Sequence, residues 1–110
     1  MNRFYTAVGR FEIRRHFRDV RCPQVVIGRR EYILDVQEML LWSSLNWRIL
    51  ELDEIQTLFE QKELETGFSS NRPMEDCLRR LIQRGLVAEG SGETAADALY
   101  DLLSELYVVP

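Results

Sequence analysis

The sequence predicts a small α+β domain in which a β-hairpin precedes several amphipathic helices. Three observations support this class. Two β-rich runs flank a Gly-Arg-Arg-Glu turn near residue 30, apolar residues recur at helical spacing beyond residue 36, and capping patterns precede the helical stretches. With 110 residues and 45% hydrophobic content, we expect one domain with one core.

The stretch from Asn71 to Val87 carries the most complete helix signal. Pro73 suits the first helical turn, and Gly85 suits a left-handed C-terminal cap. Residues on one apolar face of this helix are Met74, Cys77, Leu78, Leu81 and Ile82. Their predicted packing partners in the preceding helices are Trp42, Leu45, Ile55 and Phe59. Trp47 is assigned to the core together with Trp42.

Two helices are expected before this one. Asp35 and Glu38 have the form of a capping box, which predicts a helix over residues 36–45. Asp53 and Gln56 repeat the pattern at the start of a second helix. A helix, a turn and a second amphipathic helix would therefore follow one another.

The two ends of the chain are harder to interpret. Residues 4–18 fit either a helix or a strand, and Cys22-Pro23 is expected to end that segment before the hairpin. Near the C-terminus, Leu86 to Glu89 predicts a strand and Gly90-Ser91-Gly92 a tight turn. Thr94 then caps a final helix whose apolar side holds Ala95, Ala98, Leu99, Leu102, Leu103 and Leu106.

Charge divides the chain into two parts. Residues 1–30 hold eight arginines and two acidic residues, a net charge of +6, whereas the remainder holds six basic and sixteen acidic residues, a net charge of −10. We predict a basic N-terminal arm over residues 1–23 and a folded domain over residues 24–110. The arm either approaches nucleic acid or pairs with the acidic body of the protein.

The order of elements resembles two groups of winged-helix proteins. The helix pair and the R-x-x-x-R-G-L-V-like end formed by Arg80, Arg84, Gly85, Leu86 and Val87 resemble transcriptional regulators of the MarR and PadR kind. The N-terminal hairpin before the helices is similar to that of PqqD-like modules, which bind a peptide at a sheet edge. The similarity covers about Gln24 to Glu89 and implies a winged-helix-like fold. Because the cap at Thr94 stands where a typical wing would need a second strand, we expect this wing to be short or absent.

The resemblance to regulators implies double-stranded DNA as the partner. Arginine and glutamine side chains reach phosphate oxygens and base edges. The side chains expected to contact DNA are those of Arg79, Arg80, Gln83 and Arg84 in the helix and of Arg14, Arg15 and Arg18 in the arm. A homodimer is also expected, and the leucines of its interface would be Leu99, Leu102, Leu103 and Leu106.

The alternative is a module that binds a protein or peptide and no DNA. The edge that would accept a partner strand comprises Val25, Val26, Ile27, Tyr32, Ile33 and Leu34. On this alternative the helix arginines would pair locally at i, i+4 spacing, Arg79 with Glu75 and Arg80 with Asp76.

Catalysis, metals and cofactors are not predicted. The single histidine, His16, lies in an arginine-rich run, and with Cys22 and Cys77 it makes a scattered and incomplete ligand set for zinc. The only Gly-x-Gly stretch, residues 90–92, lacks the remaining residues of a phosphate-binding loop.

The predicted location is cytoplasmic. No apolar run approaches the roughly twenty residues that cross a bilayer, and two cysteines without a Cys-x-x-Cys spacing suit a reducing compartment. Cys22 lies beside Arg21, whose charge would stabilise a thiolate, so a redox-sensing thiol and an inert one both remain open.

Overall fold

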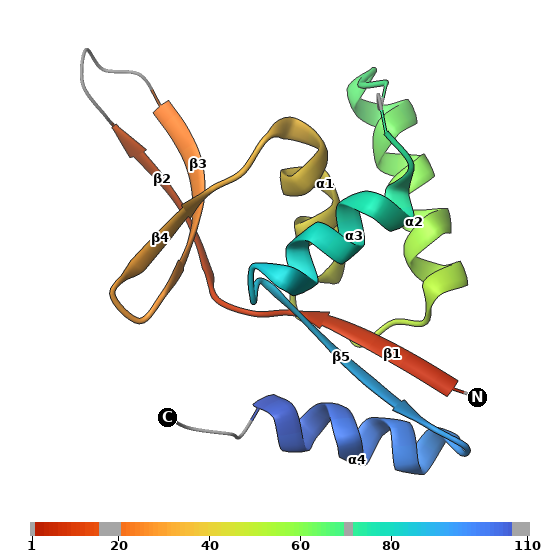
Figure 1. The fold of residues 1–110 in the computed structure, drawn as a ribbon. Coiled ribbons are helices and arrows are strands. Elements are labelled where there is room, and N and C mark those ends of the chain that lie inside the picture. The colour runs from red at the N-terminus through yellow and green to blue at the C-terminus, as the bar shows by residue number, and fades with distance from the viewer. Residues whose placement is uncertain (1, 16–20, 70–71, 107–110) are drawn as a thin grey trace.

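The computed structural model describes the backbone of residues 2–15, 21–69 and 72–106, and the side chains of these residues except 13–15 and 21–23. The α+β class is confirmed (Figure 1). In chain order the elements are β1 (Asn2–Ala7), β2 (Arg10–Arg15), β3 (Arg21–Ile27), β4 (Arg30–Ile33), α1 (Val36–Leu45), α2 (Leu52–Thr66), α3 (Met74–Gln83), β5 (Val87–Gly92) and α4 (Ala95–Leu106). No helix in the described part of the chain is both long and apolar enough to span a bilayer.

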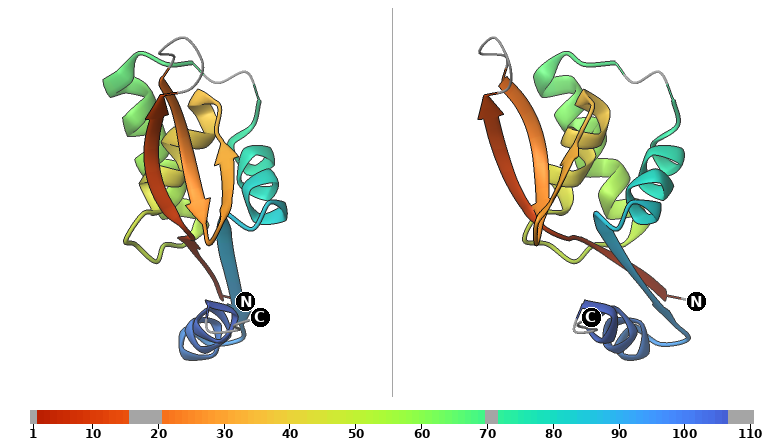
Figure 2. Two further views of the ribbon diagram at one scale, coloured as in Figure 1. Left: turned by 90° about the vertical axis from the view of Figure 1, so that its left-hand side faces the viewer. Right: turned by 60° about the vertical axis from the view of Figure 1, so that its left-hand side comes forward.

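The strands form two antiparallel sheets. In the first, β1 pairs with β5 over its whole length, and Leu50 forms an isolated bridge to Tyr5 on the other edge of β1. In the second, β3 lies between β2 and β4. Helices α1 to α3 cover one side of the β1-β5 sheet and α4 covers the other (Figures 1 and 2).

In the described part of the chain, the N-terminal strands β1 and β2 pack against the rest of the domain. Tyr5 of β1 is 5% exposed and lies in the core. Phe11 of β2 stacks on Trp42 of α1, with ring centroids 6.2 Å apart. The boundary predicted at residue 23 falls inside β3. The sequence fitted either a helix or a strand over residues 4–18. The described residues of this segment are extended, because β1 pairs with β5 and β2 pairs with β3.

Cys22-Pro23 does not end the segment before it, since both residues lie within β3. The pairing of β3 with β4 stops at Gln24 opposite Ile33, so Pro23 pairs only with β2, opposite Ile13. A proline is tolerated where no ladder hydrogen bond is required of its nitrogen. The proline therefore marks the point at which β3 loses its second neighbour.

The predicted core around α3 is confirmed. Leu78 and Leu81 are buried, and Met74 and Ile82 pack against the same cluster. Their buried neighbours on α1 and α2 are Trp42, Leu45, Ile55 and Phe59. The prediction for Trp47 is wrong: this side chain is 95% exposed. Trp47 follows the end of α1 with a φ of 63°, and this left-handed turn carries its ring away from the core.

Most helix caps follow the sequence prediction. At α1, the Glu38 N–H donates to Asp35 Oδ1 at 2.8 Å and the Asp35 N–H donates to Glu38 Oε1 at 3.1 Å. At the end of α3, Gly85 has a φ of 77°, and the N–H groups of Gly85 and Leu86 donate to Ile82 and Leu81 carbonyls.

The start of α2 differs from the prediction. Its capping box is formed by Glu51 and Glu54, two residues before the predicted pair of Asp53 and Gln56. Just before this helix, Leu50 forms the isolated bridge to Tyr5.

The predicted turn at Gly90-Ser91-Gly92 is also wrong, because these residues continue β5. A Cβ added at Gly90 would lie 2.4 Å from the Cβ of Leu102, and one at Gly92 would lie 2.6 Å from the Ala98 nitrogen. The glycines therefore allow α4 to approach the strand closely. The predicted cap of α4 is confirmed, since the Asp97 N–H donates to Thr94 Oγ1 at 3.1 Å.

Candidate functional site

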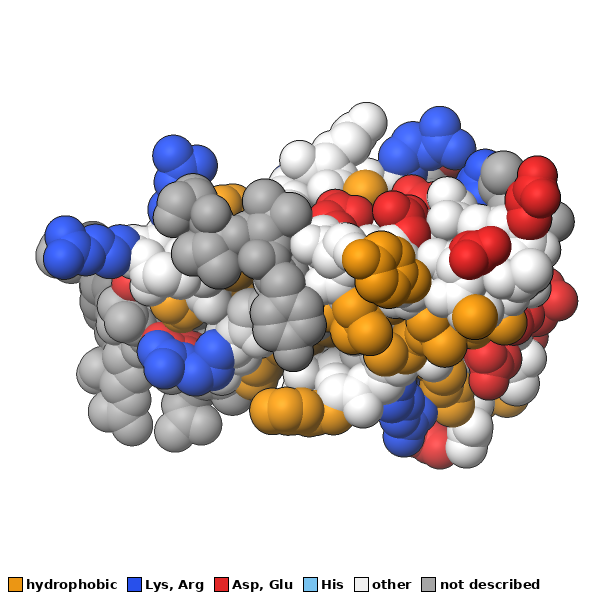
Figure 3. Space-filling view, turned by 90° about the horizontal axis from the view of Figure 1, so that it is seen from below, with side chains coloured by type: hydrophobic (Ala, Val, Ile, Leu, Met, Phe, Trp, Pro, Cys, Tyr) orange, Lys and Arg blue, Asp and Glu red, His pale blue; other side chains and the backbone are white. Residues whose placement is uncertain are grey.

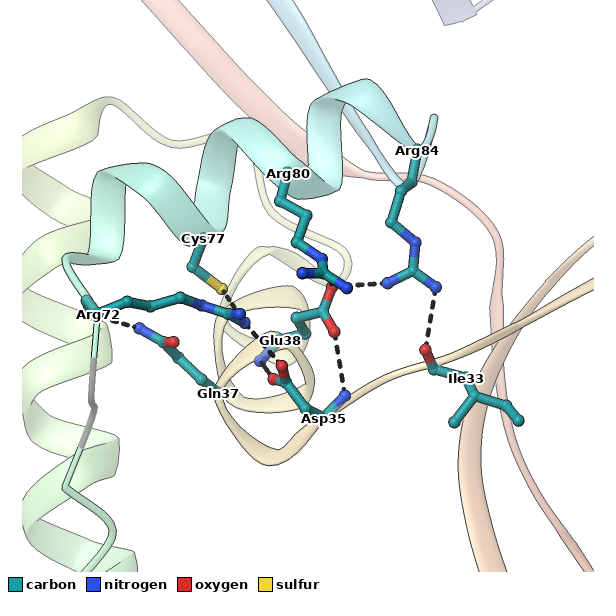
Figure 4. A network of polar contacts seen from close by, with 8 residues as sticks. All are labelled: Ile33, Asp35, Gln37, Glu38, Arg72, Cys77, Arg80 and Arg84. Atoms are coloured by element: carbon teal, nitrogen blue, oxygen red, sulfur yellow. Dashed lines mark hydrogen bonds and ion pairs between the residues drawn. The ribbon is translucent and has the colours of Figure 1, made fainter.

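Helix α3 carries polar residues on two sides, and those facing α1 surround one carboxylate. Glu38 of α1 is 2% exposed. Arg84 Nη1 lies 2.6 Å from Glu38 Oε2, and Arg80 Nε lies 3.4 Å from the same oxygen. Figure 4 shows the carboxylate beneath α3, reached by both guanidinium groups. A buried carboxylate is strongly disfavoured without partners, so these two arginines stabilise the folded state by neutralising Glu38.

Arg84 also joins α3 to the edge strand β4. Its Nη2 donates to the Ile33 carbonyl at 3.0 Å, and its guanidinium lies 5.7 Å from the centre of the Tyr32 ring. The Arg84 side chain is 25% exposed. One side chain thus bridges the end of α3, the start of α1 and β4 (Figure 4).

A second ion pair lies at the other end of α3. Arg72 Nη2 donates to Asp35 Oδ2 at 2.8 Å, and Gln37 Nε2 donates to the Arg72 carbonyl at 2.9 Å. Burial opposes ionisation of Asp35, but the Glu38 N–H and the Arg72 guanidinium outweigh it and hold the pKa of Asp35 below its ordinary value. This pair secures the entry into α3 to the cap of α1.

Cys77 adjoins this ion pair but is not disposed as a nucleophile. Its thiol is buried, and Arg72 Nη2 lies 3.7 Å from its sulfur. Burial raises the pKa of the Cys77 thiol, and the nearby Arg72 only partly offsets that effect. Across the described residues, no group of three His, Cys, Asp or Glu side chains is placed to hold a metal ion.

The predicted DNA-contacting residues do not share one face of α3. Arg80 and Arg84 turn toward Glu38, whereas Arg79 and Gln83 line a hollow beside β1 and β5. The predicted pairing of Arg80 with Asp76 is wrong, because the ion pair of Arg80 is with Glu38. No ion pair between Arg79 and Glu75 is found in the described part of the chain.

Several predicted residues fall outside the described part of the structure. They are Arg18 and His16, and the side chains of Arg14, Arg15 and Cys22. Two hypotheses therefore stay predictions: that arginines of the basic arm contact DNA, and that Cys22 is a redox-sensing thiol.

The predicted partner edge is reduced to β4. Val25, Val26 and Ile27 belong to β3, which has β2 on one side and β4 on the other, so they do not form an edge. Leu34 follows β4 and is 4% exposed in the core. Tyr32 and Ile33 are on the edge strand itself.

The backbone of β4 presents Ile33 to the outside. Gly28 and Arg29 form a two-residue turn, and Ile27 pairs with Arg30 to close it. Alternation along an antiparallel pair then directs the N–H and C=O of Ile33 away from β3. The Arg84 hydrogen bond to the Ile33 carbonyl agrees with this direction. The Ile33 side chain is 57% exposed.

The predicted dimer interface is divided by the packing of α4. Leu102 is fully buried against β5 and is unavailable to a second copy, because Ala98 and Leu102 form the side of α4 that meets the sheet. Leu103 and Leu106 are 43% and 39% exposed, and Leu99 is half-buried. The underside of the molecule, where α4 lies, shows a row of hydrophobic side chains (Figure 3).

Glu38 and Arg72 are site residues that the sequence did not reveal. The capping box explained Glu38 and hid its second role as a buried counter-charge. Its spacing contained a signal, because Glu38 lies three and four residues before Leu41 and Trp42, on the side of α1 that is buried.

Comparisons of the chain with protein-family models, with curated proteins and with solved structures give no match. The resemblance to winged-helix proteins therefore remains a hypothesis drawn from the sequence.

Proposed function

We propose that this domain is a protein- or peptide-binding module that accepts an extended segment along the outer edge of β4. One observation carries the proposal. The outward carbonyl of Ile33 has an arginine side chain as its partner, where a sheet interior would supply a strand. Edge strands of this kind bind extended peptides by adding a strand to the sheet.

The residues around this edge suit such a segment. An incoming backbone N–H replaces Arg84 at the Ile33 carbonyl, while Arg84 keeps its ion pair with Glu38. Ile33 and Val36 are 57% and 48% exposed and offer apolar contacts to alternate side chains of the segment. Backbone hydrogen bonds supply affinity, and these side chains supply selectivity.

The DNA-binding regulator is less well supported. DNA readers of this kind present their polar residues from one helix face, whereas the arginines of α3 divide between two sides. Arg84 is held by a buried carboxylate, and Glu75 and Glu89 lie near Arg79 around the hollow. Homodimerisation and a cytoplasmic location remain predictions from the sequence.

The test uses peptides selected from a library of random linear sequences. Ile33→Pro removes the outward N–H and places a proline ring on the edge, yet it spares the hydrogen bonds from β4 to β3. Ile33→Val is the matched control, because it retains the N–H and a β-branched side chain. A melting curve for each variant verifies that the domain is folded.

The proposal predicts that selected peptides bind wild type and Ile33→Val alike. Ile33→Pro should weaken them by about tenfold or more, as the loss of an edge hydrogen bond implies. Peptides that bind folded Ile33→Pro as tightly as wild type would contradict strand addition at β4.

A further inference from the structure

A hollow of about 470 Å³ lies between α3 and the β1-β5 sheet, on the side of the helix away from Glu38. This volume is within the range of small-molecule sites. The sheet contributes Arg3, Tyr5 and Glu89 to its lining, and α3 contributes Leu78, Arg79 and Ile82. The hollow shares none of these residues with the β4 edge, so it is independent of the proposed peptide site.

The sheet side of the hollow is fixed by backbone pairing. Tyr5 and Leu50 exchange backbone hydrogen bonds of 2.8 and 3.0 Å, and Tyr5 stands opposite Glu89 in the β1-β5 register. Arg3 Nη1 lies 3.7 Å from Glu89 Oε1. Burial and the Glu89 carboxylate raise the pKa of Tyr5, so the phenol stays protonated and can donate a hydrogen bond.

The helix side supplies Arg79, a cation whose guanidinium is not held by a salt bridge in the described residues. Arg79 is exposed and forms no ion pair in the described part of the chain, unlike Arg80 and Arg84 on the other side of α3. Leu78 is 4% exposed and Ile82 is half-buried, so the floor between the charged groups is apolar.

We propose that this hollow binds the carboxylate end of an apolar amino acid, either free or at the C-terminus of a peptide. Arg79 holds the carboxylate, because its guanidinium presents two parallel N–H donors to both oxygens. Leu78 and Ile82 receive the apolar side chain. Glu75 and Glu89, which also line the hollow, receive the ammonium group when the amino acid is free.

The test is a titration followed by amide chemical shifts, with leucine, N-acetyl-leucine and leucinamide as probes. Each is raised to about 20 mM, which populates complexes of millimolar Kd. We expect leucine, N-acetyl-leucine or both to shift the amide resonances of β1 and α3. Leucinamide, which lacks the carboxylate, should bind at least about tenfold more weakly than the tighter of these two probes. Leucine as the tighter probe indicates a free amino acid, and N-acetyl-leucine of equal or greater affinity indicates a chain end.

Two arginine variants complete the test. Arg79→Gln should weaken the bound probe by about tenfold or more and leave the melting temperature unchanged. Arg48→Gln is the matched control, since Arg48 is exposed and lines a different hollow between α1 and α2, and it should leave binding unchanged. Leucinamide binding as tightly as leucine, full binding by Arg79→Gln, or no shift with either carboxylate overturns the proposal.

Discussion

The two sides of α3 carry the same kinds of residue in opposite settings. Toward α1, Arg80 and Arg84 are tied to Glu38, a carboxylate that is 2% exposed. Toward β1 and β5, Arg79 is exposed, and the nearby Glu89 is 33% exposed. Arginines only one and five positions from Arg79 therefore stabilise the fold, whereas Arg79 itself remains available to a ligand.

This difference shows why an arginine-rich helix is weak evidence for DNA binding. The helix pattern places arginines on the polar face, but it does not show which of them meet a buried acid. Glu38 lies 46 residues before Arg84 in the sequence. The ion pair between them could therefore be predicted only from the tertiary packing. The contrast leads to three predictions on stability.

The largest effect is expected from removing Glu38, the buried acid that faces α3 from α1. Glu38→Ala leaves Arg84 without its partner and breaks the capping box of α1, so we expect a loss of about 3–5 kcal/mol in the free energy of unfolding. Glu89→Ala, the matched change on the exposed side, should cost within about 1 kcal/mol. Urea unfolding measures both. Similar losses for the two variants would remove the contrast.

A smaller effect is expected from the arginines themselves. Arg84→Gln leaves the Glu38 carboxylate with the capping N–H of Asp35 and the longer ion pair to Arg80, and we expect a cost of about 2–3 kcal/mol. Arg79→Gln should change the free energy of unfolding by less than about 0.5 kcal/mol. The same unfolding experiment compares them. A costly Arg79→Gln would mean that the exposed side is structural too.

The smallest effect concerns pH and the Asp35–Arg72 pair. The pKa of Asp35 is lowered in the folded state, so its contribution is full above the ordinary value of about 3.9 and is lost as pH falls through the folded-state pKa. Asp35→Asn keeps a capping oxygen but loses the charge. Because the Asp35 side chain is 49% exposed, the deficit at neutral pH should be below about 1 kcal/mol.

Urea titrations between about pH 3 and pH 7 follow this difference, since they bracket the ordinary carboxyl pKa. The deficit of Asp35→Asn should shrink toward the acid end. Glu105→Gln, on the exposed surface of α4, is the control variant. A deficit independent of pH would show that the Asp35 carboxylate adds no stability through its charge.

The sequence predicted what depends on near neighbours in the chain. The α1 capping box and the glycine end of α3 follow from residues within five positions of one another. It missed what depends on distant contacts: the pairing of β1 with β5, the exposure of Trp47, and the glycines at 90 and 92, which read as a turn without knowledge of α4. The candidate site was only partly predicted, because the β4 edge and Arg84 were seen but their connection through Glu38 was not.

The most direct test of the peptide-binding account compares two ligands on one isotope-labelled sample. Amide shifts are followed on adding a library-selected peptide and, separately, random-sequence duplex DNA at about 50 mM salt, where non-specific attraction is strongest. The account predicts that the peptide shifts the Ile33 amide and its neighbours in β4, and that DNA shifts nothing. DNA that shifts the amide resonances of Arg79 and Arg80, with an affinity that falls steeply as salt is raised, would contradict the account. That result would favour the DNA-binding regulator instead.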